Sequence, residues 1–120
     1  MKKITVLMLD NNQRFLTTAK DFLSEQDFIK EVFTTISDTD ARRIASEKEP
    51  DVILLDIIMP QMDGFEVCKN LKKDDLTKHI PIVMVTAIKT DTLSRVKGLS
   101  TGADAFLSKP IDPIELSAQI

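Results

Sequence analysis

Blocks of apolar residues alternate with polar segments along the chain, and the length of each block helps to separate strands from helices. Four near-continuous apolar runs have the length and composition of strands that are covered on both faces, as in a parallel sheet. A fifth segment, residues 31–35, is more polar, which favours a place near the edge of that sheet. The predicted strands are residues 4–9, 31–35, 52–56, 80–86 and 105–107.

Apolar residues between these strands recur at the spacing of amphipathic helices. Asp63 and Gly64 are expected to open the third helix. A fifth helix is expected near Asp112 and Pro113, where a capping residue precedes a proline suited to the first helical position. The stripes that predict the other helices are Phe15, Leu16, Ala19, Phe22 and Leu23, then Ala41, Ile44 and Ala45, then Phe65, Val67, Cys68 and Leu71, and then Leu93, Val96 and Leu99.

The strict alternation of strands and helices predicts an α/β fold. We expect a doubly wound, five-stranded parallel sheet with helices on both faces, which makes a three-layer sandwich. The chain of 120 residues suits one domain, and residues 1–120 show no repeat or linker. The last helix has room for about nine residues, fewer than the ~11–12 of an average helix. This favours either an unusually short helix or a segment cut from a longer protein.

Composition narrows the class of protein. With 42% hydrophobic and 29% charged residues, the chain has the balance of a soluble globular domain. The formal net charge is −3 and the 16 basic residues are dispersed, which argues against direct nucleic-acid binding. No apolar run approaches the ~20 residues of a membrane span. The five methionines, the lone Cys68 and the lack of a signal-peptide pattern favour a reducing, cytoplasmic location.

Polar side chains stand at the carboxyl ends of four predicted strands. They are Asp10 and Asn11 after the first strand, Asp56 at the end of the third, Thr86 at the end of the fourth and Lys109 after the fifth. Parallel strands place these ends on one edge of the sheet, where ligands bind in open α/β folds. Since loops are polar in any protein, one such residue would mean little, whereas four at converging ends indicate a site.

The residue types at this edge fit phosphoryl transfer to Asp56. A carboxylate that attacks a phosphoryl donor brings two negative groups together, and a Mg²⁺ ion held by carboxylates would reduce their repulsion. Lys109 would supply a second positive charge, and the Thr86 hydroxyl a hydrogen bond. The product is an acyl phosphate, whose charge can bias a surface with two conformations. We therefore predict that Asp56 is a nucleophile that carries a phosphoryl group.

Four motifs at the strand ends carry a family resemblance. They are Val-Leu-Met-Leu-Asp10, Leu-Leu-Asp56-Ile-Ile-Met-Pro-Gln-Met-Asp-Gly, Pro-Ile-Val-Met-Val-Thr86-Ala and Gly-Ala-Asp-Ala-Phe106-Leu-Ser-Lys109-Pro. As a set they are highly specific. Over essentially its whole length the chain resembles the receiver domain of two-component response regulators, the CheY-like fold. The resemblance implies the strand order 2-1-3-4-5 of flavodoxin-like proteins.

The resemblance also implies a role for each residue at this edge. It implies that Asp56 accepts a phosphoryl group from a sensor histidine kinase or a phosphotransfer protein. It implies that Thr86 and Lys109 contact that group, and that Mg²⁺ is the cofactor. The implied metal ligands are Asp10, Asn11, Asp56 and the backbone carbonyl of Ile58.

A conformational switch is implied as well. Phe106 is similar to the aromatic residue that turns inward in this family as the threonine, here Thr86, moves towards the phosphate. The implied signalling surface is formed by residues 90–120. The output would be a docked partner, a phosphorylation-dependent homodimer or an effector domain after Ile120, and the sequence does not decide among them.

One position departs from the family pattern. Receiver domains usually carry two adjacent acids after the first strand, where this chain has Asp10 and Asn11. Asn11 keeps an oxygen ligand but removes one negative charge, so we expect weaker Mg²⁺ affinity. A one-residue shift of the alignment would instead make Asp10 the direct ligand, although the spacing of Phe15 and Leu16 favours the first alignment.

A second expectation concerns the lifetime of the phosphoryl group. The resemblance places Ile58 and Ile88 beside the path of the hydrolytic water. Both side chains are apolar, so neither can orient that water by a hydrogen bond, and both would shield the acyl phosphate. We therefore expect slow self-dephosphorylation.

Three other functions fit parts of the pattern. A degenerate receiver that acts as a phosphorylation-independent interaction module is supported by Asn11, whereas Asp56, Thr86 and Lys109 oppose it. A magnesium phosphohydrolase needs a second acid two residues after its nucleophile, where this chain has Ile58. A flavin-binding protein of the flavodoxin type is disfavoured because Trp and Tyr are absent. The leading prediction is a phosphorylation-controlled signalling module that is not an enzyme.

Overall fold

A five-stranded parallel sheet forms the centre of the computed structural model, which describes residues 2–56, 58–59, 62–86 and 102–108. The strand order is β2-β1-β3-β6-β7, and every neighbouring pair is parallel. This confirms the doubly wound fold and the order 2-1-3-4-5. In chain order the elements are β1 (Ile4–Leu9), α1 (Gln13–Ser24), β2 (Ile29–Thr35), α2 (Asp38–Lys48), β3 (Val52–Asp56), β4 (Ile58–Met59), β5 (Met62–Asp63), α3 (Gly64–Lys73), β6 (Ile82–Thr86) and β7 (Ala105–Ser108).

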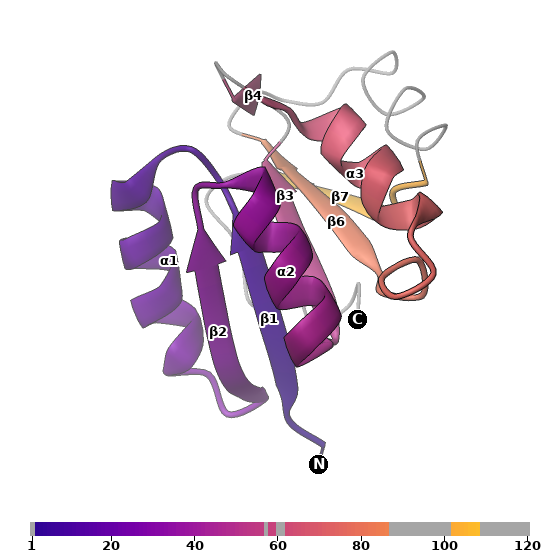
Figure 1. Ribbon diagram of the computed structural model, residues 1–120. Coiled ribbons are helices and arrows are strands. Elements are labelled where there is room, and N and C mark those ends of the chain that lie inside the picture. The colour runs from indigo at the N-terminus through magenta and orange to yellow at the C-terminus, as the bar shows by residue number, and fades with distance from the viewer. Residues whose placement is uncertain (1, 57, 60–61, 87–101, 109–120) are drawn as a thin grey trace.

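The sheet separates two hydrophobic cores. Helix α1 covers one face, and α2 and α3 cover the other (Figure 1). Because successive side chains of a strand point to opposite faces, β1 contributes to both cores. Its residues Leu7 and Leu9 pack with α2 and α3, whereas Val6 and Met8 pack with α1. Strands β3 and β6 alternate in the same way, which explains their continuous apolar sequences.

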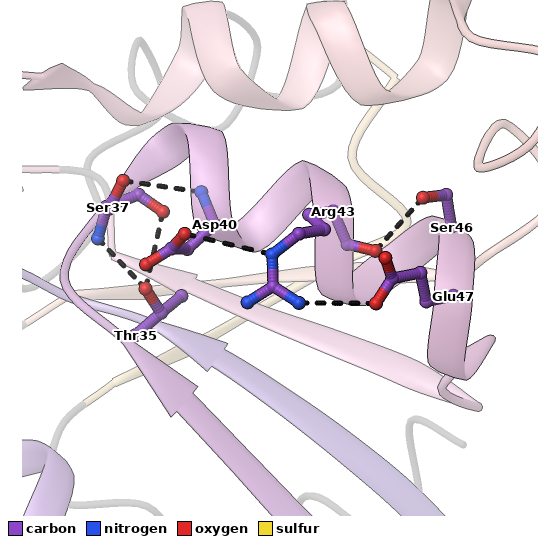
Figure 2. Close-up of polar contacts among 6 residues, drawn as sticks. All are labelled: Thr35, Ser37, Asp40, Arg43, Ser46 and Glu47. Carbon is purple, nitrogen blue, oxygen red and sulfur yellow. Dashed lines mark hydrogen bonds and ion pairs between the residues drawn. The ribbon is translucent and has the colours of Figure 1, made fainter.

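Short polar side chains fix where the first two helices begin. Asn12 precedes α1, and its side-chain oxygen accepts a hydrogen bond from the Phe15 amide at 3.0 Å. Ser37 precedes α2, and its Oγ accepts from the Asp40 amide at 3.3 Å (Figure 2). These caps satisfy amides that a helix leaves without partners in its first turn.

The structure differs from the predicted elements in several details. Phe22 was expected in the buried stripe of α1, but its side chain is 42% exposed, so the buried face of that helix is narrower than its apolar stripe. Strand β2 begins earlier than predicted, at Ile29. Strand β6 begins later, at Ile82, although Ile80 is buried in the core. The antiparallel pair formed by β4 and β5 was not predicted.

The third helix matches its prediction closely. It begins at Gly64, directly after Asp63, and buries the predicted apolar stripe. Cys68 lies on that face and is fully buried, as its place in the predicted stripe indicates. The helices expected at residues 90–100 and near Asp112 lie outside the described residues. Among the described helices, none is long and apolar enough to cross a membrane.

Two aspartates fasten neighbouring strands at the edge where the strands begin, which we term the amino edge. The Asp51 carboxylate accepts a hydrogen bond from the Thr5 amide at 2.7 Å, and the Asp51 amide donates to the Thr5 carbonyl at 2.8 Å. Asp104 repeats this double contact with Ile82, at 2.8 Å in each direction. Each aspartate therefore fixes the position of its own strand against the next one.

Lys72 extends the second of these contacts to helix α3. Its ammonium group donates to the Asp104 carboxylate at 3.0 Å and to the Ile80 carbonyl at 2.9 Å. The aliphatic part of Lys72 lies against Gly102, where an added Cβ would come within 2.9 Å of Lys72 Cγ. Gly102 also has a φ of 98°, which L side chains rarely adopt. A glycine at this position thus allows the close packing of the lysine stem.

Candidate functional site

Asp10 and Asp56 stand side by side at the edge where the strands end, which we term the carboxyl edge. Leu9 of β1 is paired with Leu55 of β3, and each aspartate is one residue beyond that pair. Neighbouring strands are about 5 Å apart, so the two backbones approach to about that distance. Both residues are buried, with exposed fractions of 2% for Asp10 and 5% for Asp56. The predicted convergence of these two carboxylates is therefore present.

Hydrogen bonds hold the loop that carries Asp10 between β2 and α1. The Asp10 amide donates to the Thr35 carbonyl at 3.3 Å. The Asp10 carboxylate accepts from the Asn12 amide at 2.9 Å, and Asn12 in turn caps α1. Asn11 lies between these two anchored residues and is exposed. The loop therefore presents one buried carboxylate and one exposed amide at the rim of the site.

Strand pairing places Thr86 one residue beyond the partner of Asp56 on the neighbouring strand. Asp56 is paired with Val85 of β6, so Thr86 is one residue further towards the carboxyl edge. Thr86 is paired with Ser108 at the end of β7. Two residues earlier on the same strands, Met84 is paired with Phe106. The side chains of Thr86 and Phe106 are not among those described, and Lys109 and Ile88 lie outside the described residues.

A small hairpin follows Asp56 at the same edge. It consists of β4 and β5, with Ile58 opposite Asp63 and Met59 opposite Met62. Sequence patterns cannot find strands of two residues, because an alternation of period two needs more positions to be visible. The hairpin places the backbone of Ile58, one of the predicted metal ligands, in a regular element directly beside the phosphoacceptor candidate.

The donor set at this edge fits a hard cation rather than a transition metal. Within the described residues, no three His, Cys, Asp or Glu side chains gather into a group that could hold a metal ion. The predicted magnesium ligands are of a different kind, because they combine two carboxylates with an amide and a backbone carbonyl. Such a set leaves positions for water and phosphate oxygens, which is how Mg²⁺ is usually bound in phosphoryl-transfer sites.

Comparison with known proteins identifies the family. The family model described as "Response regulator receiver domain" matches residues 6–120. The chain belongs to the response regulator receiver domain family. This confirms the resemblance seen in the four motifs, and it places the carboxylate pair in a family of signalling domains.

Similar receiver domains occur in longer proteins. The chain is 47% identical over 90 residues to the response regulator PleD of Caulobacter vibrioides. This match covers 75% of the chain and 20% of PleD. It is 34% identical over 115 residues to the alkaline phosphatase synthesis transcriptional regulatory protein PhoP of Bacillus subtilis. This match covers 96% of the chain and 46% of PhoP. The chain thus spans a fifth to just under half of the length of these two relatives.

A solved receiver structure supports the same fold. The chemotaxis response regulator CheY4 of Vibrio cholerae superposes with a TM-score of 0.85 at 28% identity. The match covers 99% of this chain and all of that one. The match therefore agrees with the receiver fold of the described residues.

Proposed function

We propose that this receiver domain is a phosphoacceptor in a two-component system, with Asp56 as the residue that takes the phosphoryl group. The observation that supports this most strongly is the position of Asp56, buried at the end of the central strand and in register with Asp10. An Asp56 oxygen would bond to phosphorus as the phosphorus–nitrogen bond of a phosphohistidine breaks. The leaving nitrogen would keep the electron pair and take a proton.

The residues around Asp56 would support this transfer in different ways. Asp10, Asn11, Asp56 and the Ile58 carbonyl would hold Mg²⁺, which when bound offsets the negative charge of the reacting groups. Thr86 would donate a hydrogen bond to the phosphoryl group and Lys109 would add a positive charge. The domain assists its own phosphorylation and dephosphorylation but is not an enzyme that turns over a separate substrate.

The phosphorylation would change the surface of the domain. Thr86 is the last residue of β6, and Phe106 lies near the end of the neighbouring strand β7. A movement of one residue can therefore affect the other. We infer that they relay the change to the surface formed by residues 90–120. The longer relatives support an effector domain after Ile120 as the output, and a phosphorylation-dependent homodimer is the alternative. The location that suits this pathway is the cytoplasm.

The lifetime of the modification follows from two apolar positions. We infer that Ile58 and Ile88 keep hydrolytic water from being oriented beside Asp56, so that the acyl phosphate decays slowly. The half-life of the phosphoryl group is expected to shorten in Ile58→Asn and Ile88→Glu variants. An unchanged half-life in both would contradict this inference.

The direct test is labelling with a small phosphodonor. The wild-type protein, Asp56→Asn and Asp51→Asn are incubated with acetyl phosphate, with and without Mg²⁺, and analysed by intact mass. Asp51 is the matched control, because it precedes the same strand at the amino edge. We expect one phosphoryl group on the wild type and on Asp51→Asn in the presence of Mg²⁺, and none on Asp56→Asn.

Two results would contradict the proposal. Labelling that persists in Asp56→Asn would place the phosphoryl group elsewhere. A wild type that is never labelled would favour the second candidate, a degenerate receiver that binds partners without phosphorylation. The observation that supports this second candidate is Asn11, which is neutral and exposed.

A further inference from the structure

One exposed apolar side chain lies on the carboxyl edge itself. Among the described residues, the large hydrophobic side chains that remain exposed are Phe22 at 42%, Ile36 at 52% and Leu76 at 64%. Phe22 lies on α1, and Leu76 lies in the connector from α3 to β6. This connector leads into the start of β6 and so lies at the amino edge (Figure 1). Ile36 follows directly after β2, at the carboxyl edge.

Strand register places Ile36 directly after a β2 residue that is level with the residues before the two aspartates. Thr35 is paired with Leu9, and Leu9 is paired with Leu55. Ile36, Asp10 and Asp56 each come one residue after these paired positions. Two strand spacings separate Thr35 from Leu55, so the residues that follow them, Ile36 and Asp56, have backbones on the order of 10 Å apart.

The backbone on both sides of Ile36 is fastened. The Thr35 carbonyl accepts from the Asp10 amide, and the Thr35 hydroxyl accepts from the Ser37 amide at 3.1 Å (Figure 2). Ser37 in turn caps α2. These contacts keep residue 36 at the rim, so its side chain remains in water in the isolated domain.

A protein that delivers a phosphoryl group to Asp56 must cover this position. Even a small transient interface buries about 600 Å² on each partner, which corresponds to a circle of about 14 Å radius. A footprint of that size centred on Asp56 includes a residue about 10 Å away. The exposed residues at the start of α1 on the same edge, Asn11 to Arg14, are polar, so Ile36 offers an apolar contact among them.

We propose that Ile36 is a docking residue for the protein that donates the phosphoryl group. The inference rests on the proposed function, since it assumes that Asp56 is the acceptor. Burial of part of the Ile36 side chain would strengthen binding of the donor protein and leave the chemistry at Asp56 unchanged. Acetyl phosphate is too small to reach Ile36 and Asp56 together, so it provides a donor that is independent of the docking contact.

The test compares these two kinds of donor. Purified sensor histidine kinases from the source organism are autophosphorylated with labelled ATP, and the kinase that labels the wild type fastest is used as the probe. Rates of transfer are measured over a range of receiver concentrations for wild type, Ile36→Ser, Ile36→Leu and Leu76→Ser. Leu76→Ser is the matched control, because it removes an apolar residue that is even more exposed, from the opposite edge.

For Ile36→Ser we expect kcat/KM with the kinase to fall about tenfold, as expected for losing roughly half of the burial of an isoleucine side chain. The maximal rate and the rate with acetyl phosphate should stay within about twofold of wild type, since the chemistry is untouched. Ile36→Leu should restore most of the loss, and Leu76→Ser should behave as wild type.

Several outcomes would overturn the inference. They are an unchanged kcat/KM in Ile36→Ser, an equal loss in Leu76→Ser, and a parallel loss with acetyl phosphate. A wild type that acetyl phosphate labels but that accepts nothing from any kinase would also overturn it, while leaving the proposed function intact. A wild type that neither donor labels would overturn both.

Discussion

The two edges of the sheet use aspartate in different ways. At the amino edge, Asp51 and Asp104 each accept the amide of a neighbouring strand, and both side chains are partly or largely exposed. At the carboxyl edge, Asp10 and Asp56 are buried and lie in register on adjacent strands. Two carboxylates placed so close together repel each other when both are ionised. The amino edge therefore contributes hydrogen bonds between strands, whereas the carboxyl edge holds the two carboxylates for which we propose metal binding and phosphoryl transfer.

The largest effect should come from breaking the amino edge at Asp104. Asp104→Ala removes the acceptor of the Ile82 amide and the partner of the Lys72 ammonium. Hydrogen bonds to charged groups contribute more than neutral ones, so we expect a loss of about 2 kcal/mol in the free energy of unfolding. Urea unfolding followed by circular dichroism measures it. Asp75→Ala is the control, because Asp75 is 89% exposed in its pair with Lys78 and should change little.

At the carboxyl edge, restoring an acid should strengthen metal binding. Asn11→Asp adds a third carboxylate beside Asp10 and Asp56. We expect the affinity for Mg²⁺ to rise about tenfold, since one added charge at close range contributes of the order of a kcal/mol. Calorimetric titration of both proteins with MgCl₂, without any phosphodonor, gives the two affinities. Equal affinities would mean that residue 11 is not a metal ligand.

A smaller effect of opposite sign to the first is expected at Asp56. Asp56→Asn removes one of the two buried charges while keeping the shape of the side chain. Without Mg²⁺, we expect the free energy of unfolding to rise by about 1 kcal/mol, because the repulsion with Asp10 is relieved. The same substitution at Asp51 should not stabilise the protein. Stabilisation by both substitutions, or by neither, would remove the contrast between the edges.

The smallest effect should be found on the outer surface of α2, away from both edges. Arg43 pairs with Asp40 at 3.9 Å and with Glu47 at 3.2 Å, and its side chain is 55% exposed (Figure 2). Exposed ion pairs contribute little, so Arg43→Ala should change the free energy of unfolding by less than about 0.5 kcal/mol. A larger loss in urea unfolding would show that this surface network contributes more than exposed pairs usually do.

Much of the fold could be predicted from the sequence because its signals are local. The buried strands are largely apolar, and the turn residues Asp63 and Gly64 mark the start of α3. The carboxylate pair was predictable too, because parallel strands bring their carboxyl ends to one edge. Family motifs then suggested the roles that we propose for individual residues, which spacing alone cannot give.

Other features depend on contacts that the sequence does not encode locally. Lys72 and Asp104 are 32 positions apart, and neither stands out in its own segment. Phe22 fits a helical stripe, but only the packing of α1 on the sheet determines where the buried face ends. The docking role of Ile36 likewise follows from register across three strands, which a single segment does not reveal.

The buried position of Cys68 has a practical consequence. The chain has neither tryptophan nor tyrosine, so its intrinsic fluorescence offers a poor report on unfolding. Cys68 is its single thiol, and an alkylating reagent can reach it when the packing of α3 on the sheet opens. The rate of alkylation under native conditions therefore gives a site-specific record of how often that side of the molecule opens, with no label to introduce.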